Sequence, residues 1–285
     1  TADFADIDND GDFDCLVTNH STTLLLLEND GTGNFTDITP NSGLEVTGFF
    51  LQAKLEDFDN DGYVDLIYSG GAHAYFKNIG DHRFTNVPNM FPYGDTMHSF
   101  ATGDVNRDGQ VDVYASYGNS YVSPDNSNDD VLWINNGNPD QHWITFELEG
   151  FQSNRDAVGA TVEITGAFGT QVRSGRAGES YGMTSTFSCH FGLGANDVVE
   201  TATVFWPSGL TTELTTPAVD QYHTVLEVPC TVPLEITATS TELCPGESVL
   251  LMAPAGFSSY DWSDGTNAGN MLEVTASGLY TLTAF

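Results

Sequence analysis

The chain has 285 residues, of which 40 are acidic and 7 are basic, so its formal net charge at pH 7 is -33. A field of that sign repels nucleic acid and anionic membrane surfaces and attracts cations. Hydrophobic residues make up 40% of the chain and aromatic residues 12%, enough apolar surface for packed cores and too much for general disorder. The length predicts two or three domains, since a single core typically serves roughly 100 to 200 residues.

Apolar runs are short throughout the sequence. The longest candidate, Leu24 to Leu27, is the size of a strand and falls far below the roughly 18 residues of a membrane span. We therefore predict no membrane span in this chain. The sequence lacks an initiator Met and starts shortly before a complete motif, so we expect it to be a fragment of a longer protein.

Three Asp-rich segments repeat along the first half. They are DIDNDGDFD from Asp6 to Asp14, DFDNDGYVD from Asp57 to Asp65 and DVNRDGQVD from Asp104 to Asp112. The offsets are 57 minus 6, or 51 residues, and 104 minus 57, or 47 residues. A short apolar run follows each segment, and then a strand-like run that closes on an Asn/Gly turn. Each unit therefore predicts four strands with an Asp loop between the first two, which is the size of a propeller blade.

Alternating oxygen-bearing residues in a tight loop are suited to Ca²⁺, which takes six to eight oxygen ligands at about 2.3 to 2.6 Å. Positions 1, 3, 5 and 9 would supply side chains, position 7 its backbone carbonyl, and the Gly at position 6 the sharp turn. The predicted ligands are Asp6, Asp8, Asp10, Asp12 and Asp14 in the first loop, Asp57, Asp59, Asp61, Tyr63 and Asp65 in the second, and Asp104, Asn106, Asp108, Gln110 and Asp112 in the third.

Two other interpretations of these loops are disfavoured. An EF-hand needs a Glu at position 12 and flanking helices, whereas Val17, Tyr68 and Ala115 stand there. A metal-free Asx-rich turn would crowd carboxylates that repel one another by roughly 3 to 4 kcal/mol per pair at about 4 to 5 Å. Asn106 replaces an Asp and Arg107 adds a positive charge, so we expect the third loop to bind calcium most weakly.

Beyond Trp143 the Asp loops stop and alternating strands predict a β-sandwich or barrel that ends near Val228. The predicted strands are Ile144–Leu148, Ala160–Ile164, Thr170–Arg173, Thr186–Phe191 and Ala202–Trp206. Pro229, Cys230 and Pro233 suggest a linker. The segment from Leu234 to Phe285 predicts four or five short strands around Trp262, as in an immunoglobulin-like domain truncated at its C-terminus. The expected domains are residues 1–140, 141–229 and 230–285.

Candidate catalytic groups are few. The sequence contains no HxH, HExxH or CxxC pattern and no Gly-x-Ser-x-Gly around Ser185, Ser188 or Ser208, so we predict packed or surface roles for its histidines, His190 included, and no enzyme activity. Arg155, Arg173 and Arg176 could form an anion-binding spot, but ion pairs with nearby acids such as Glu179 are favoured.

The cysteines divide into two pairs. Cys15 and Cys189 lie in apolar runs that predict buried free thiols. Cys230 and Cys244 flank a short segment, where a disulfide and free thiols both remain open.

At its Asp loops the chain resembles the FG-GAP/VCBS repeat family, whose calcium-loop blades also form the integrin α-subunit propeller. The resemblance covers about residues 1–140 and implies that the loop residues above are calcium ligands. A propeller of that family has about seven blades, so the resemblance implies that N-terminal blades are missing here. Residues 142–228 resemble the ASPIC/UnbV domain of cartilage acidic protein-like secreted proteins through SNRDAVGATVEI from Ser153, HFGLG from His190 and VFWPSG from Val204. Residues 244–285 resemble Ig-like repeats of bacterial surface proteins through CPGESVLL and SGLYTLTA.

These features together predict an all-β protein: a partial β-propeller, a β-sandwich or barrel and an Ig-like segment. We expect a secreted or cell-surface, calcium-binding interaction or adhesion protein whose partner is an extracellular protein or glycan. The alternatives are an accessory, non-catalytic part of a secreted polysaccharide-acting enzyme, and a glycan-binding module.

Overall fold

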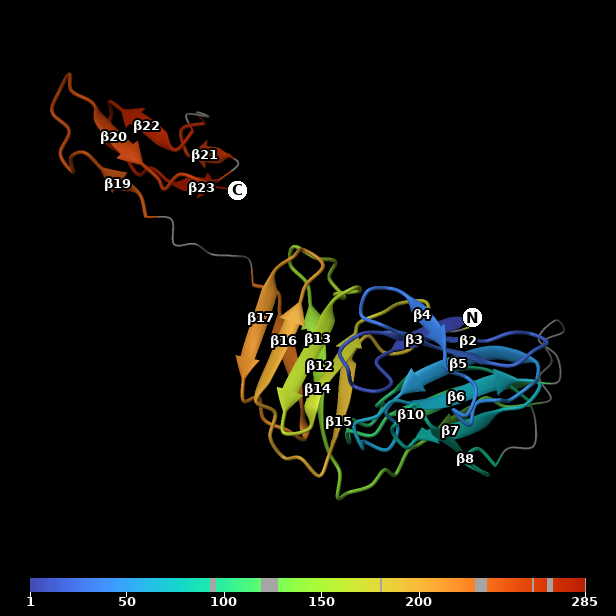
Figure 1. Ribbon diagram of the computed structural model, residues 1–285. Coiled ribbons are helices and arrows are strands. Elements are labelled where there is room, and N and C mark those ends of the chain that lie inside the picture. The colour runs from blue at the N-terminus through green and yellow to red at the C-terminus, as the bar shows by residue number, and fades with distance from the viewer. Residues whose placement is uncertain are drawn as a thin grey trace. The chain divides into compact units, whose positions relative to one another are not determined.

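The computed structural model describes residues 1–92, 96–118, 128–179, 181–228, 235–257, 259–265 and 269–284. Every regular element in these ranges is a β-strand (Figure 1), which confirms the predicted all-β class. The same ranges contain no helix with the length and apolar character needed to cross a bilayer. The chain divides into two compact units, Thr1–Val228 and Pro229–Phe285.

The first two repeats are four-stranded antiparallel meanders, as predicted. In the first, the sheet order is β1-β2-β3-β4, and in the second it is β5-β6-β7-β8. The first sheet consists of β1 (Ala2–Ala5), β2 (Asp14–Val17), β3 (Leu25–Asn29) and β4 (Phe35–Asp37). The second consists of β5 (Phe50–Glu56), β6 (Asp65–Gly70), β7 (Ala74–Asn78) and β8 (Phe84–Val87). In both, the Asp loop joins the first strand to the second, so the loop lies at the same end of each sheet.

The third repeat differs from the prediction. Its sheet has three strands, in the order β11-β10-β9: β9 (Thr96–Gly103), β10 (Asp112–Gly118) and β11 (Val131–Trp133). The expected fourth strand at Trp143 is absent from the described part of this sheet, because Trp143 lies in β12 (His142–Glu149), which pairs with strands of another sheet. The Trp143 ring packs against Gly109 of the third Asp loop.

The three repeats lie side by side and share cores, as adjacent propeller blades do. One core joins side chains such as Leu16 and Leu26 of the first repeat to Leu55 and Phe76 of the second. Another core joins the second repeat to the third, with Phe100 fully buried in it. The first strands β1, β5 and β9 are neighbours in that order. The described residues thus form part of a propeller without a closed ring.

Residues 142–228 form a two-layer β-sandwich. One sheet has the order β15-β12-β18 and the other β14-β13-β16-β17. The strands not yet defined are β13 (Thr161–Gly166), β14 (Gly169–Ser174), β15 (Cys189–Gly194), β16 (Thr201–Phe205), β17 (Thr211–Thr215) and β18 (Gln221–Leu226). The core between the sheets includes Phe146 and Phe191 from the first and Val162 and Val204 from the second.

All five strands predicted for this sandwich are present, and two strands were missed. β17 is mostly exposed and rich in Thr, and β18 is a parallel edge strand with one buried residue. Neither therefore carries the apolar alternation on which the prediction depended.

The described residues of the second unit form five short strands in two small sheets, ordered β19-β20-β22 and β21-β23. They are β19 (Thr237–Ala238), β20 (Val249–Met252), β21 (Tyr260–Trp262), β22 (Met271–Val274) and β23 (Leu282–Ala284). Trp262 is buried in its core, as predicted, and the Ig-like assignment stays a prediction. The linker residues 229, 230 and 233 lie outside the described residues.

The predictions for the cysteines are tested in part. Cys15 and Cys189 are buried free thiols, which confirms the prediction for that pair. The open question of a bond between Cys230 and Cys244 concerns residue 230, which the structure does not describe.

Candidate metal sites

The three Asp loops share one backbone conformation. Position 4 is left-handed in each, with φ of 63° at Asn9, 60° at Asn60 and 61° at Arg107. Position 6 also has positive φ, at 99° for Gly11, 99° for Gly62 and 84° for Gly109. Glycine adopts this region without a Cβ clash, and Asn tolerates it better than most residues. Gly and Asn therefore favour this turn locally, whereas Arg107 adopts the same left-handed conformation in the third loop without that preference.

The position 1 carboxylates anchor the turns. Asp6 accepts a hydrogen bond from the Gly11 N–H at 3.2 Å, and Asp57 accepts one from the Gly62 N–H at 2.9 Å. Both side chains are buried, at 0% and 1% exposure. Burial is the largest cause that raises the pKa of each to about 7; the other loop carboxylates raise it further, and the charge of Arg173 opposes them. Such a carboxylate is stabilised in its ionised form by a nearby cation.

Side chains at positions 1, 3 and 5 converge in the first two loops. Oxygens of Asp6, Asp8 and Asp10 all lie within 4.8 Å of one another, and so do oxygens of Asp57, Asp59 and Asp61. In the second loop, buried Oδ1 atoms of Asp57 and Asp59 have no hydrogen-bond partner among the described residues. Unpartnered buried carboxylate oxygens around one point fit a hard cation such as Ca²⁺.

The third loop is arranged differently. The Asn106 amide donates to Asp108 Oδ2 at 2.8 Å, so the amide nitrogen turns toward the carboxylate. Position 1 is also occupied from outside, because the Tyr222 hydroxyl donates to Asp104 Oδ2 at 2.7 Å. The Tyr222 hydroxyl shares Asp104 Oδ2 with the Gly109 N–H, which donates to it at 2.6 Å. Oδ2 of Asp6 and Oδ2 of Asp57 accept the equivalent glycine N–H groups.

Position 9 ties each loop to its sheet. The Asp65 carboxylate accepts hydrogen bonds from the N–H groups of Phe58 at 3.2 Å and Asn78 at 2.8 Å, and from the Tyr75 hydroxyl at 2.8 Å. Asp14 and Asp112 accept the equivalent pairs of backbone N–H groups. Burial raises the pKa of Asp14 to about 6 and of Asp65 to about 9. The position 9 residues therefore brace the loop, and their role as calcium ligands stays a prediction.

The position 7 residues contact their loops through the backbone N–H. Asp12, Tyr63 and Gln110 each donate their N–H to the position 5 carboxylate, at 3.1, 3.0 and 2.9 Å. The predicted carbonyl ligation at position 7 stays a prediction.

Protein cations near the loops were missed at the sequence level. The Lys77 ammonium from β7 pairs with Asp59 and, at 2.8 Å, with Asp61. His82, in the turn between β7 and β8, places Nε2 2.8 Å from Asp8 of the first loop. Lys77 lies on a strand beside its loop and His82 in a different repeat from Asp8, so no linear spacing could reveal either contact.

Position 4 links each loop to the next. The Asn9 amide donates to the Gly62 carbonyl at 3.1 Å, and the Asn60 amide donates to the Gly109 carbonyl at 2.9 Å. The third loop has Arg107 at this position, and its guanidinium forms a two-pronged contact with Glu147 of β12 at 2.9 and 3.1 Å. Position 4 therefore joins the first loop to the second, the second loop to the third, and the third loop to the sandwich.

The sandwich docks on the second loop through the HFGLG segment. His190 Nε2 lies 2.7 Å from Asn60 Oδ1, and the Gly194 N–H donates to the Asn60 carbonyl at 2.8 Å. At Gly192 an added Cβ would lie 2.1 Å from Asp57 Oδ2, so only glycine allows this approach. His190 is a packed, hydrogen-bonded imidazole, in agreement with its predicted structural role.

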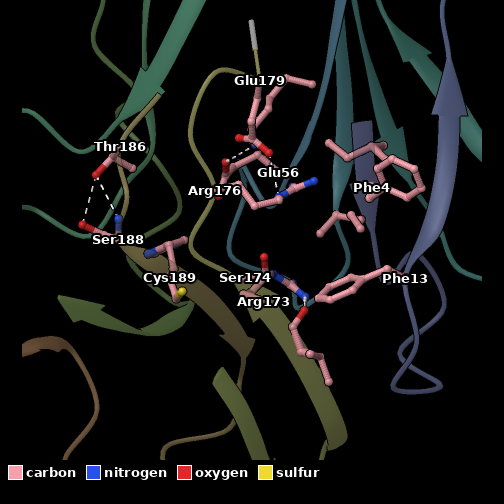
Figure 2. A pocket seen from close by; sticks show the side chains of 16 residues that line it. Phe4, Phe13, Glu56, Arg173, Ser174, Arg176, Glu179, Thr186, Ser188 and Cys189 are labelled. Carbon is pink, nitrogen blue, oxygen red and sulfur yellow. Dashed lines mark hydrogen bonds and ion pairs between the residues drawn. The ribbon is translucent and has the colours of Figure 1, made fainter. Parts of the chain in front are cut away.

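A second contact region lies where the sandwich meets β1 and β5 (Figure 2). It surrounds a cavity of about 30 Å³, the volume of one water molecule. Arg176 pairs with Asp3 at 3.1 Å and with Glu179 at 2.6 Å, and Glu179 also pairs with Lys54 at 2.8 Å. The predicted Arg176–Glu179 ion pair is confirmed.

The fold and the loops define an all-β protein in which tandem Asp-loop repeats are joined to a β-sandwich. A family model for the FG-GAP-like repeat matches residues 6–68 and 57–115, and one for ASPIC and UnbV matches residues 150–231. The chain therefore carries FG-GAP-like repeats followed by an ASPIC/UnbV domain, as the motif resemblance predicted. Both families suggest an extracellular protein of the adhesion or interaction type. No curated protein matches the chain.

Proposed function

We propose that this chain is part of a secreted or cell-surface interaction protein in which Ca²⁺ in the Asp loops is structural. The proposal assigns no catalytic residue and takes an extracellular protein or glycan as the partner. The observation that carries it is the convergence of Asp57, Asp59 and Asp61, whose ligand oxygens lie within 4.8 Å of one another and include buried atoms without a hydrogen-bond partner.

The surroundings of the loops support a structural role for the ion. Residues of the second loop that do not face its centre hold the third loop and the sandwich, through Asn60. An ion that orders the loop would therefore order these contacts as well. Binding only to the folded state shifts the folding equilibrium toward it by mass action.

Thermal unfolding in millimolar Ca²⁺ and in chelator tests the calcium proposal. We expect the midpoint to rise by several degrees with calcium, and the rise to shrink in Asp57→Asn and Asp6→Asn. Asp81→Asn is a matched control, since Asp81 is an exposed side chain outside the loops. Coincident melting curves with and without calcium would contradict the proposal.

A glycan-binding role is the second candidate, and a cavity between the second and third repeats favours it. The cavity has a volume of about 610 Å³ and is lined by aromatic and amide side chains, among them Tyr75, Phe91, Trp133 and Asn136. Ligand sites commonly span about 300 to 1,000 Å³. Glycan and protein arrays, probed with and without calcium, separate the two candidates, and Trp133→Ala should abolish binding only if a glycan occupies this cavity.

A further inference from the structure

One histidine points at two carboxylates outside the centre of the first Asp loop. His82 Nε2 lies 2.8 Å from Asp8 Oδ2 and 3.5 Å from Glu28 Oε1. The three ligand atoms all lie within 4.8 Å of one another. The same ring nitrogen thus faces both carboxylates, so an ion at their centre would meet one nitrogen and two oxygens.

These three residues come from three separate elements. Asp8 belongs to the first Asp loop, Glu28 to β3, and His82 to the β7–β8 turn of the next repeat. That turn is built from consecutive left-handed residues, with φ of 52° at Asp81 and 55° at His82, and is closed by the Arg83 N–H to the Gly80 carbonyl at 3.1 Å. Gly or Asn would suit this turn type better than His, so turn geometry alone does not account for the imidazole.

The donor set separates this cluster from the calcium loops. Ca²⁺ takes oxygen ligands, whereas an imidazole with two carboxylates suits Zn²⁺ and similar divalent transition metals. Among the groups of metal-capable side chains in the described residues, this one alone contains a nitrogen donor. Zn–N and Zn–O distances are about 2.0 to 2.2 Å, so Asp8 and His82 would separate by only a few tenths of an ångström to admit the ion.

The cluster is also open to solvent and held in orientation. Side-chain exposures are 32% for His82, 21% for Asp8 and 36% for Glu28, so an ion could enter and water could complete its shell. Asp8 Oδ1 is occupied separately, because it accepts the Asp10 N–H at 3.3 Å. One Asp8 oxygen can thereby face the loop centre while the other faces His82.

We propose that Asp8, Glu28 and His82 form a second metal site, specific for a divalent transition metal such as Zn²⁺, that ties the first repeat to the second. The site adds a cross-link between neighbouring blades at their outer hairpins. It does not depend on calcium in the loops, although Asp8 is shared between the two sites.

Calorimetric titration of Zn²⁺ into the calcium-loaded protein tests this site, with the metal-free protein titrated in parallel. We expect one equivalent of Zn²⁺ to bind in both forms and to be lost in His82→Ala and in Glu28→Gln. His223→Ala is the matched control, because this imidazole lies outside the cluster, where it contacts the Ala218 carbonyl and stacks on the Phe146 ring. Co²⁺ in place of Zn²⁺ should show visible absorption bands that disappear in His82→Ala.

Three results would overturn the proposal: no Zn²⁺ binding to the wild-type chain, undiminished binding to His82→Ala, or equal loss in His223→Ala. Unchanged calcium stabilisation of His82→Ala shows that the variant is folded. If calcium failed to stabilise any variant while Zn²⁺ still bound the wild type, the calcium proposal alone would fall.

Discussion

Nε2 of His190 in the sandwich donates a hydrogen bond to Oδ1 of Asn60 in the second Asp loop, at 2.7 Å. The assignment of donor and acceptor follows from the neighbours. The Asn60 amide nitrogen already donates to the Gly109 carbonyl, so its oxygen must accept. His190 Nδ1 then accepts the Thr145 hydroxyl at 2.8 Å. One asparagine side chain thus joins two loops and the sandwich.

Asn60→Ala should lower the free energy of unfolding by about 2 to 4 kcal/mol, because it leaves a buried imidazole N–H and a buried carbonyl without partners. Asn34→Ala, an exposed asparagine in the β3–β4 turn, should change stability little. Chemical denaturation measures both. Equal effects in the two variants would show that Asn60 does not carry this contact.

Stability should fall in mildly acidic solution because of His190. Burial, followed by the charge of Arg173, lowers the pKa of this imidazole to about 4 from an ordinary 6.5. The unfolded chain takes up the proton first, so this stabilisation is fully present above about pH 6.5 and is lost as the pH falls toward 4. The loss amounts to roughly 1.4 kcal/mol per unit of pKa difference. His190→Gln should flatten the pH profile of stability in this window, and an unchanged slope would contradict the role of His190.

Gly192→Ala should separate the sandwich from the second loop or destabilise the chain by about 1 to 3 kcal/mol or more. The new Cβ would lie 2.1 Å from Asp57 Oδ2 and 2.4 Å from the Asn60 Cα. Gly175→Ala is the matched control, since its nearest contacts would be an ordinary 3.5 Å. Thermal unfolding and limited proteolysis report the outcome, and a Gly192→Ala variant as stable as the control would contradict the docking role of this glycine.

Lys77→Gln should tighten calcium binding at the second loop several-fold. The Lys77 ammonium pairs with Asp59 and Asp61, so Ca²⁺ must displace it. Arg83→Gln makes the same change of charge in the same repeat but removes only an exposed pair with Asp81, and it should have a smaller effect. If both variants shift the calcium titration equally, the general field of the molecule, and not the displaced ammonium, sets the affinity.

The third loop should bind calcium most weakly of the three. At positions 1, 3, 5 and 9 it has three carboxylates against four in each of the other loops, and its Asp104 is engaged by Tyr222. Asp6→Ala, Asp57→Ala and Asp104→Ala, compared by calcium titration at micromolar metal, should show the smallest loss for Asp104→Ala. Loss of the tightest binding event in Asp104→Ala would mean that ligand charge does not rank these sites. Arg107 has a smaller part in this ranking than its charge suggests, because it is turned toward Glu147.

The sequence by itself determined the all-β class, the Asp loops with their shared turn, and the two families. These features are local: each loop is specified by its own Asp, Asn and Gly residues, and each strand by alternation over a few positions. Where alternation was weak, as in the exposed β17 and the edge strand β18, prediction failed. The fourth strand expected in the third repeat was also wrong, because Trp143 lies in β12, which pairs with strands of the sandwich.

Only the tertiary structure decided which residues meet across repeats. His82 faces Asp8 and Glu28, His190 holds Asn60, and Lys77 enters the second loop, although the separations along the chain reach 130 residues for the His190–Asn60 pair. Such contacts depend on how sheets stack and how the sandwich docks. Those arrangements are set by the burial of apolar side chains. The spacing of apolar residues along the chain does not indicate which polar residues that burial will bring together.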